Sequence, residues 1–121
     1  MNLDWLQSEE NSLIYIGDTL CSWCYGFAPE LDKFIEKHPL LTLRMVQGGL
    51  RPNGVEMVHQ MEEFLKSHWI EIEKRTGQPF SFDMFTNEDF VLDTEPASRA
   101  VIVCRMMDPT KELAFFKAVQ I

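Results

Sequence analysis

The feature that most constrains the fold is a strand–helix–strand pattern, with two cysteines where the first strand meets the helix. Residues 12–16, SLIYI, form a short β-rich apolar run. From Cys24 onward apolar residues recur at helical spacing until HPL at 38–40, where the proline disfavours further helix. Residues 40–49, LLTLRMVQGG, then predict a second strand. Two strands joined by a helix predict a βαβ unit with a parallel pair.

The sequence CSWC at residues 21–24 is compatible with a zinc site, a structural disulfide or a redox-active dithiol. Zinc needs about four ligands. We expect no metal site, because His38, His59 and His68 are scattered and there is no second cysteine pair. Three cysteines are also too few for a disulfide scaffold. A redox-active pair is therefore favoured, with two unpaired core cysteines as the alternative.

The predicted place of Cys21, at the mouth of the helix, has chemical consequences. The first amides of a helix are unsatisfied and its dipole is positive there, so a thiolate would be stabilised. The pKa of such a thiol falls from about 8.5 into the range of about 3.5–7.5. Cys24 lies on the same helical face, close enough to attack a mixed disulfide on Cys21. We therefore predict Cys21 as the reactive thiol and Cys24 as the resolving one, with Ser22 and Trp23 tuning the redox potential.

Composition and charge exclude several classes of protein. The chain has 121 residues, of which 45% are hydrophobic and 25% charged, as in a single globular domain. Its 19 acidic and 11 basic residues give a net charge of −8, which argues against nucleic acid as a partner. No run approaches the roughly 18 apolar residues of a membrane span. The start of the sequence does not resemble a signal peptide, so we expect a cytoplasmic protein.

The segment YIGDTLCSWCYGFAPEL at residues 15–31 resembles the active-site segment of DsbA-like thiol–disulfide oxidoreductases in the thioredoxin superfamily. It is most similar to a bacterial branch of predicted protein-disulfide isomerases. That branch has CSWC or CPWC followed by Trp or Tyr, Gly and Phe, and a GGL that closes the second strand; residues 25–27 and 48–50 match these features. Pro29 matches the proline that kinks the active-site helix of the superfamily.

The resemblance implies an α/β fold, with a thioredoxin-like (DsbA-type) βαβ unit in residues 1–50 and an inserted helical region in residues 51–121. It implies dithiol–disulfide exchange through Cys21 and Cys24 with protein or peptide thiols and disulfides. No cofactor is implied beyond the redox-active disulfide, with glutathione as an alternative co-substrate. In the family, further strands and a cis-proline facing the cysteines follow the helical region. None of the prolines here has that position, so we expect this chain to lack the C-terminal strands and the cis-proline loop.

Two other functions remain open. A glutathione-dependent transferase or isomerase of the kappa type occurs on the same architecture, where one serine or cysteine at the position of Cys21 activates glutathione. The presence of Cys24 favours the oxidoreductase. A non-catalytic interaction module is the third possibility.

Several expectations concern the helical region. Apolar residues at helical spacing from residue 55 to residue 72 predict one long helix, ended by Gly77. The sequence PFSFDMFTNEDF at 79–90 predicts a core-filling loop, with a substrate surface as the alternative. Thr94 predicts the N-cap of a later helix, and Cys104 is expected to be buried on that helix.

Two expectations concern surfaces. Trp23 and Tyr25 are expected to stay partly exposed beside the cysteines, as a platform for peptide or glutathione, the alternative being that both cap the core. The strand at 12–16 should have one edge without a neighbour. We expect that edge to be filled by a second copy in a homodimer, by the segment MNLDWLQ folding back, or by residues absent from this chain.

Overall fold

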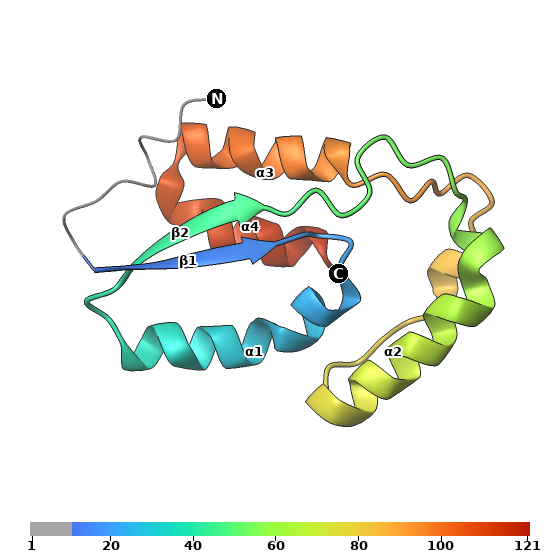
Figure 1. Cartoon of the computed structure of the whole chain (residues 1–121), viewed down its shortest axis with the longest axis horizontal. Helices are drawn as coiled ribbons and strands as arrows, with labels where there is room; N and C mark the ends of the chain where they lie inside the picture. The colour runs from blue at the N-terminus through green and yellow to red at the C-terminus, as the bar shows by residue number, and fades with distance from the viewer. Residues whose placement is uncertain (1–10) are drawn as a thin grey trace.

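The structure is a computed structural model that describes residues 11–121. Strand β1 (Ser12–Gly17), helix α1 (Ser22–Lys37) and strand β2 (Thr42–Gln47) follow one another along the chain. The two strands pair in parallel, which confirms the predicted βαβ unit. In Figure 1 they lie side by side, with α1 on one side and the C-terminal helices on the other.

Helix α1 starts at the cysteine pair. Cys21 occupies the N-cap position with an extended backbone, and Ser22 is the first helical residue. At the other end, the His38 amide donates to the carbonyls of Phe34 and Ile35, both at 3.1 Å. The helix ends there because the residue before a proline avoids the α conformation.

Three more helices follow β2: α2 (Glu62–Thr76), α3 (Glu95–Met107) and α4 (Glu112–Val119). The prediction of a single helix from residue 55 was wrong at its start, although Gly77 ends α2 in the left-handed conformation, as predicted. Residues 56–58 pair with residues 90–92 instead. The Val58 amide donates to the Phe90 carbonyl and the Leu92 amide to the Glu56 carbonyl, both at 2.8 Å. These long-range bonds hold the backbone out of the helix.

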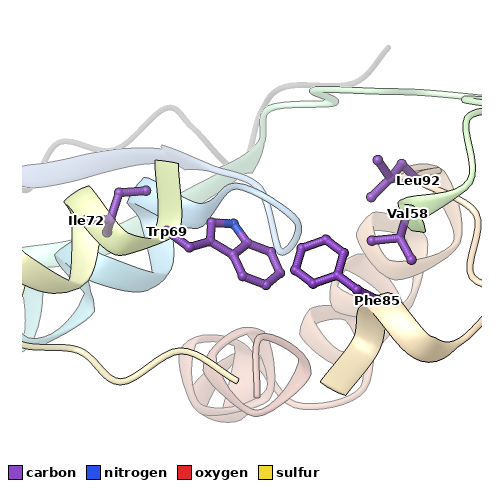
Figure 2. Close-up of a cluster of buried hydrophobic side chains, with 5 residues drawn as sticks. All are labelled: Val58, Trp69, Ile72, Phe85 and Leu92. Atoms are coloured by element: carbon purple, nitrogen blue, oxygen red, sulfur yellow. The ribbon is translucent and has the colours of Figure 1, made fainter. Parts of the chain in front are cut away.

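The apolar stripe of α2 forms the first of two buried clusters. This cluster contains Val58, Trp69, Ile72, Phe85 and Leu92 (Figure 2). Phe80 and Phe90 pack against it, so the phenylalanine-rich loop at 79–90 fills the core as predicted. The other cluster contains Met45, Val101 and Phe116, with Tyr15 and Cys24 packed against it. It therefore joins β1, β2 and the start of α1 to the two C-terminal helices.

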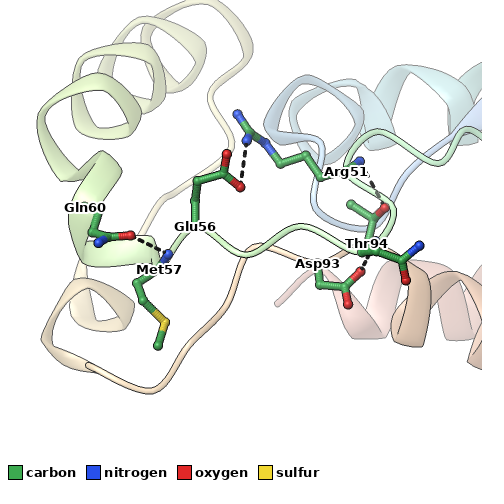
Figure 3. A network of polar contacts seen from close by, with 7 residues as sticks. Arg51, Glu56, Met57, Gln60, Asp93 and Thr94 are labelled. Carbon is green, nitrogen blue, oxygen red and sulfur yellow. Dashed lines mark hydrogen bonds and ion pairs between the residues drawn. The ribbon is translucent and has the colours of Figure 1, made fainter.

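Of two predictions for α3, the N-cap position is confirmed and the burial of Cys104 is wrong. Thr94 does occupy the N-cap position, but its hydroxyl does not cap the helix. It accepts a hydrogen bond from the Arg51 amide at 3.1 Å and ties the loop after β2 to α3 (Figure 3). Cys104 is half-buried rather than part of the core, and it lines an open groove between α3 and α4. The buried residues of α3 are Ser98 and Val101.

The sheet has two strands in the part of the chain that the structure describes. One edge of β1 therefore has no partner strand there, and Ile14 and Ile16 of β1 are 50% and 66% exposed. Residues 11–121 contain no cis peptide bond. The segment MNLDWLQ lies outside the described residues. No described helix is both long and apolar enough to span a bilayer.

Candidate active site

Cys21 and Cys24 lie one helical turn apart at the start of α1, both as free, half-buried thiols. A hydrogen bond from the Cys24 side chain is the main reason why the pKa of Cys21 falls to about 6. The backbone amides of Cys24 and Trp23 lower this pKa further, while burial and the charge of Asp18 oppose them. The helix N-terminus thus contributes as predicted, but the neighbouring thiol contributes more.

Cys24 has the opposite electrostatic environment. Its hydrogen bond to Cys21 and its burial raise the pKa of Cys24 far above the usual thiol value. Hydrogen bonds from the Asp18 amide and the Tyr15 side chain act against this rise. At neutral pH the reduced pair is therefore a Cys21 thiolate that accepts a hydrogen bond from a Cys24 thiol.

Asp18 fixes the loop that carries the cysteines, a role the sequence reasoning missed. Its side chain is 3% exposed, and its two carboxylate oxygens accept hydrogen bonds from the amides of Leu20 and Leu50, each at 2.8 Å. Its carbonyl accepts from the Cys21 amide at 3.1 Å. Asp18 thereby ties the cysteine loop to the loop after β2. The available signal was an aspartate three residues before Cys21, which is typical of a side chain that bonds nearby amides in a turn.

Ser22 and Trp23 face different surroundings. The Ser22 hydroxyl accepts a hydrogen bond from the indole nitrogen of Trp69 at 2.6 Å, so it joins α1 to α2. The Trp23 side chain is 45% exposed and lies next to the Arg75 guanidinium, whose central carbon is 5.9 Å from the ring centre. Of the residues between the cysteines, Trp23 is therefore the more accessible to a partner.

Tyr25 joins the active-site helix to the segment after α2. Its hydroxyl donates to the Pro79 carbonyl at 2.6 Å. Its own carbonyl accepts from the Gln78 side chain at 3.1 Å. This carbonyl is available because Pro29, four residues later, has no amide hydrogen to donate to it. Pro29 thus leaves the Tyr25 carbonyl free to accept a hydrogen bond from the segment after α2. This effect is separate from any bend that the proline causes in the helix axis.

A cleft of about 570 Å³ opens beside Cys21. Aromatic and aliphatic side chains form most of its wall, among them Tyr25, Leu65, Trp69, Phe80 and Met84. Apart from the Cys21 thiolate, none of the side chains that line it is charged. Thr19 also lines the cleft; it is 5% exposed, and its hydroxyl has no hydrogen-bond partner among the described residues. The side-chain amide of Gln120, which also lines the cleft, has no hydrogen-bond partner among the described residues either. The cleft thus offers an apolar surface and two unpaired polar side chains next to a reactive thiol.

The structure brings all five predicted site residues to one end of the molecule, with Cys21, Ser22 and Tyr25 lining the cleft. Trp23 lies beside Arg75, and Cys24 packs against the cluster of Met45, Val101 and Phe116. In residues 11–121 no group of three or more His, Cys, Asp or Glu could hold a metal ion.

The fold, with a thiol pair at the start of the first helix of a βαβ unit, is that of thioredoxin-like proteins of the DsbA type. The chain is similar to a candidate protein disulfide isomerase from Nitrosomonas europaea, with a TM-score of 0.80 and 34% identity over 93% of this chain and 54% of that one. It is also similar to the cytosolic disulfide reductase DsbM from Pseudomonas aeruginosa, with a TM-score of 0.77 and 29% identity over 90% of this chain and 52% of that one.

A second structure of DsbM, with GSH, aligns with a TM-score of 0.75 and 30% identity, over 90% of this chain and 53% of that one. The chain therefore spans about half the length of the solved structures it matches. The sequence matches no protein-family model and no curated protein.

Proposed function

We propose that the chain carries the dithiol centre of a thiol–disulfide oxidoreductase, in which Cys21 is the nucleophile and Cys24 the resolving thiol. The observation that supports this most is the opposite tuning of the two thiols, since the pKa of Cys21 is lowered to about 6 and that of Cys24 is raised. A structural pair of cysteines would have no need of such a difference. The similarity to a disulfide reductase and a candidate isomerase points the same way.

The proposed reaction reduces a substrate disulfide in two exchanges. The Cys21 thiolate attacks one substrate sulfur, forms a mixed disulfide and releases the other substrate sulfur as a thiolate. Cys24 then loses its proton and attacks Cys21. The bond between Cys21 and the substrate breaks, and the second substrate thiolate leaves and takes up a proton. Two electrons pass from the cysteine pair to the substrate, and the reverse sequence oxidises a dithiol.

The cleft favours a peptide with uncharged side chains beside its cysteine. Apolar side chains can bury their surface against Trp69 and Phe80, whereas a carboxylate would lose its hydration beside the Cys21 thiolate with no positive side chain in the lining. The unpaired hydroxyl of Thr19 offers a hydrogen bond to a peptide amide or carbonyl. We therefore propose protein or peptide disulfides as substrates, in the cytosol, the compartment stated for DsbM.

Glutathione is the second candidate partner, because one of the similar DsbM structures is a structure with GSH. It could serve as the co-substrate that reduces the Cys21–Cys24 disulfide, or as the substrate of a transferase. A transferase needs a single activated thiol, so Cys24 would be dispensable. In the oxidoreductase Cys24 is required to release the substrate.

Insulin reduction in the presence of dithiothreitol tests the proposal with Cys21→Ser and Cys24→Ser variants. We expect Cys21→Ser to reduce insulin no faster than dithiothreitol alone. When reduced Cys24→Ser is mixed with insulin after dithiothreitol has been removed, we expect a trapped mixed disulfide that mass spectrometry detects and added dithiothreitol reverses. Full activity of Cys24→Ser in glutathione conjugation, without insulin reduction by the wild type, would favour the transferase. If the wild-type protein forms no mixed disulfide at Cys21 with any disulfide, the proposed oxidoreductase function is contradicted.

A further inference from the structure

We propose that Tyr15 is a catalytic residue of the second exchange, in which its hydroxyl donates a hydrogen bond to the Cys24 sulfur. The inference rests on the proposed function, because it concerns the step in which Cys24 resolves a mixed disulfide. Tyr15 lies in β1, six residues before Cys21, and the sequence reasoning assigned it no role.

Aromatic neighbours hold the Tyr15 ring in place. It stacks against Phe27 of α1, with ring centres 6.3 Å apart. It also meets the edge of Phe116 of α4 at 6.0 Å. Tyr15 and Cys24 pack against the same buried cluster, so the ring and the thiol lie in one part of the core.

Gly17 provides the space that lets the ring extend toward α1. Residues 15 and 17 lie on the same face of β1, because side chains alternate along a strand. A Cβ atom at Gly17 would lie 2.8 Å from Cε1 of Tyr15 and 3.1 Å from its hydroxyl oxygen. The hydroxyl end of the ring therefore occupies the place of the missing side chain, at the end of β1 that leads into the cysteine loop.

Two donors converge on the Cys24 sulfur. One is the Tyr15 hydroxyl and the other is the Asp18 amide. Burial raises the pKa of Tyr15, and the nearby cysteines add to that rise. The phenol therefore stays protonated throughout the working range of a thiolate and acts as a donor rather than as a base.

This arrangement matters when Cys24 becomes an anion. In the resolving step Cys24 gives up its proton, its sulfur bonds to that of Cys21, and the bond between Cys21 and the substrate breaks. The Cys24 sulfur is oxidised, the Cys21 sulfur stays at the disulfide level, and the departing substrate sulfur is reduced and takes up a proton. Hydrogen bonds to an anion are stronger than those to its neutral form, so Tyr15 stabilises the attacking thiolate more than the resting thiol.

Stopped-flow reaction of the reduced protein with dithiobis(nitrobenzoate) separates the two exchanges. In a Cys104→Ala background only the active-site pair reacts. Attack by Cys21 releases the first coloured thiolate, and resolution by Cys24 releases the second. We expect Tyr15→Phe to slow the second release about tenfold, the effect of one hydrogen bond to a charged group, and to leave the first unchanged.

Thr110→Val is the control, because it removes a hydroxyl that bonds to the Asp108 carboxylate in an exposed turn and that does not line the cleft. Both releases should keep their wild-type rates in this variant. A second release at the wild-type rate in Tyr15→Phe would overturn the role of Tyr15. Equal slowing of both releases would also overturn this role, because a general disturbance of the structure would then explain the effect of the substitution. Wild-type protein that releases only one thiolate would instead contradict the proposed function.

Discussion

At the scale of single residues, the chemistry of the site depends on which groups surround each sulfur. The Cys21 thiolate is stabilised first by the Cys24 side chain and then by the amides of the first helical turn. The charge of Asp18, three residues earlier, acts in the opposite direction. Asp18 thus has two opposing effects. Its hydrogen bonds hold the loop in the conformation that places Cys21 at the helix N-terminus, while its negative charge destabilises the Cys21 thiolate.

The pH dependence of alkylation tests this balance. Because the pKa of Cys21 is lowered to about 6, the rate of its reaction with iodoacetamide should be half-maximal near pH 6 and level off above that. An ordinary thiol reaches half-maximum near pH 8.5 or so. Cys24→Ala removes the main stabilising hydrogen bond, so its half-maximum should move to higher pH. Cys21→Ser should lose the low-pH reaction, and an unchanged profile in Cys24→Ala would contradict the assigned cause.

The hydrogen bond from Trp69 to Ser22 predicts a loss of stability. Ser22→Ala leaves the indole nitrogen of a side chain that is 8% exposed without its acceptor. A buried donor without a partner costs about 1–3 kcal/mol, so the free energy of unfolding in urea should fall by that amount. Ser81→Ala is the control, because the Ser81 hydroxyl bonds an amide in an exposed turn. Equal effects of the two substitutions would show that the bond to Trp69 contributes nothing specific.

At the scale of secondary-structure elements, the contact between α1 and α2 depends on Gly26. A Cβ atom at this position would lie 2.7 Å from Cγ2 of Ile72 and 3.0 Å from Cγ2 of Thr76. Both neighbours are β-branched residues of α2, whose methyl groups cannot easily rotate away. Gly26 therefore sets how closely the active-site helix approaches the helix that forms the wall of the cleft.

Gly26→Ala should destabilise the protein by about 1–3 kcal/mol, because overpacking outweighs the better helix propensity of alanine. Ile72→Leu removes the branch nearest to the new atom. If the clash is the cause, the double variant should be more stable than the sum of the two single effects predicts, as measured by urea unfolding. Strict additivity of the two substitutions would show that the clash is absent.

The sequence predicted those elements whose formation depends on local pattern. The βαβ unit and the end of α2 followed from periodicity, a proline and a glycine. The start of α2 was missed because residues 56–58 pair with residues 90–92, which no local pattern indicates. Among the site residues, Cys21 and Cys24 were predicted from their spacing. Tyr15 was missed because its role depends on the packing of its ring against residues from α1 and α4.

At the scale of the whole molecule, the feature with the largest consequence is the open edge of β1. Among the described residues β1 pairs only with β2, and Ile14 and Ile16 place apolar surface on one face of this strand. An edge strand with unpaired amides and apolar side chains tends to recruit another strand. A homodimer, one of the three expected ways to fill this edge, thus remains a prediction, with β1 as the surface through which a second copy would associate.

Light scattering tests this prediction across a range of protein concentrations. We expect the chain of residues 1–121 to self-associate, and Ile16→Lys to weaken association, because a charge on an edge strand opposes pairing with a second strand. Ile70→Lys is the control, because Ile70 is 58% exposed on α2, away from the edge. A wild-type monomer at all concentrations, or equal effects of the two lysines, would contradict association through β1.

The hydrogen bonds of Asp18 also determine which substitutions the loop after β2 can accept. Asp18 bonds the backbone amide of Leu50, whereas the Leu50 side chain is 58% exposed. Most substitutions at position 50 should therefore leave the activity of the site nearly unchanged. Proline should abolish it, because proline is the one residue without an amide hydrogen. A library randomised at this codon and selected for disulfide exchange should retain apolar, polar and charged residues alike and lose proline, even though Pro52 is accommodated two positions later.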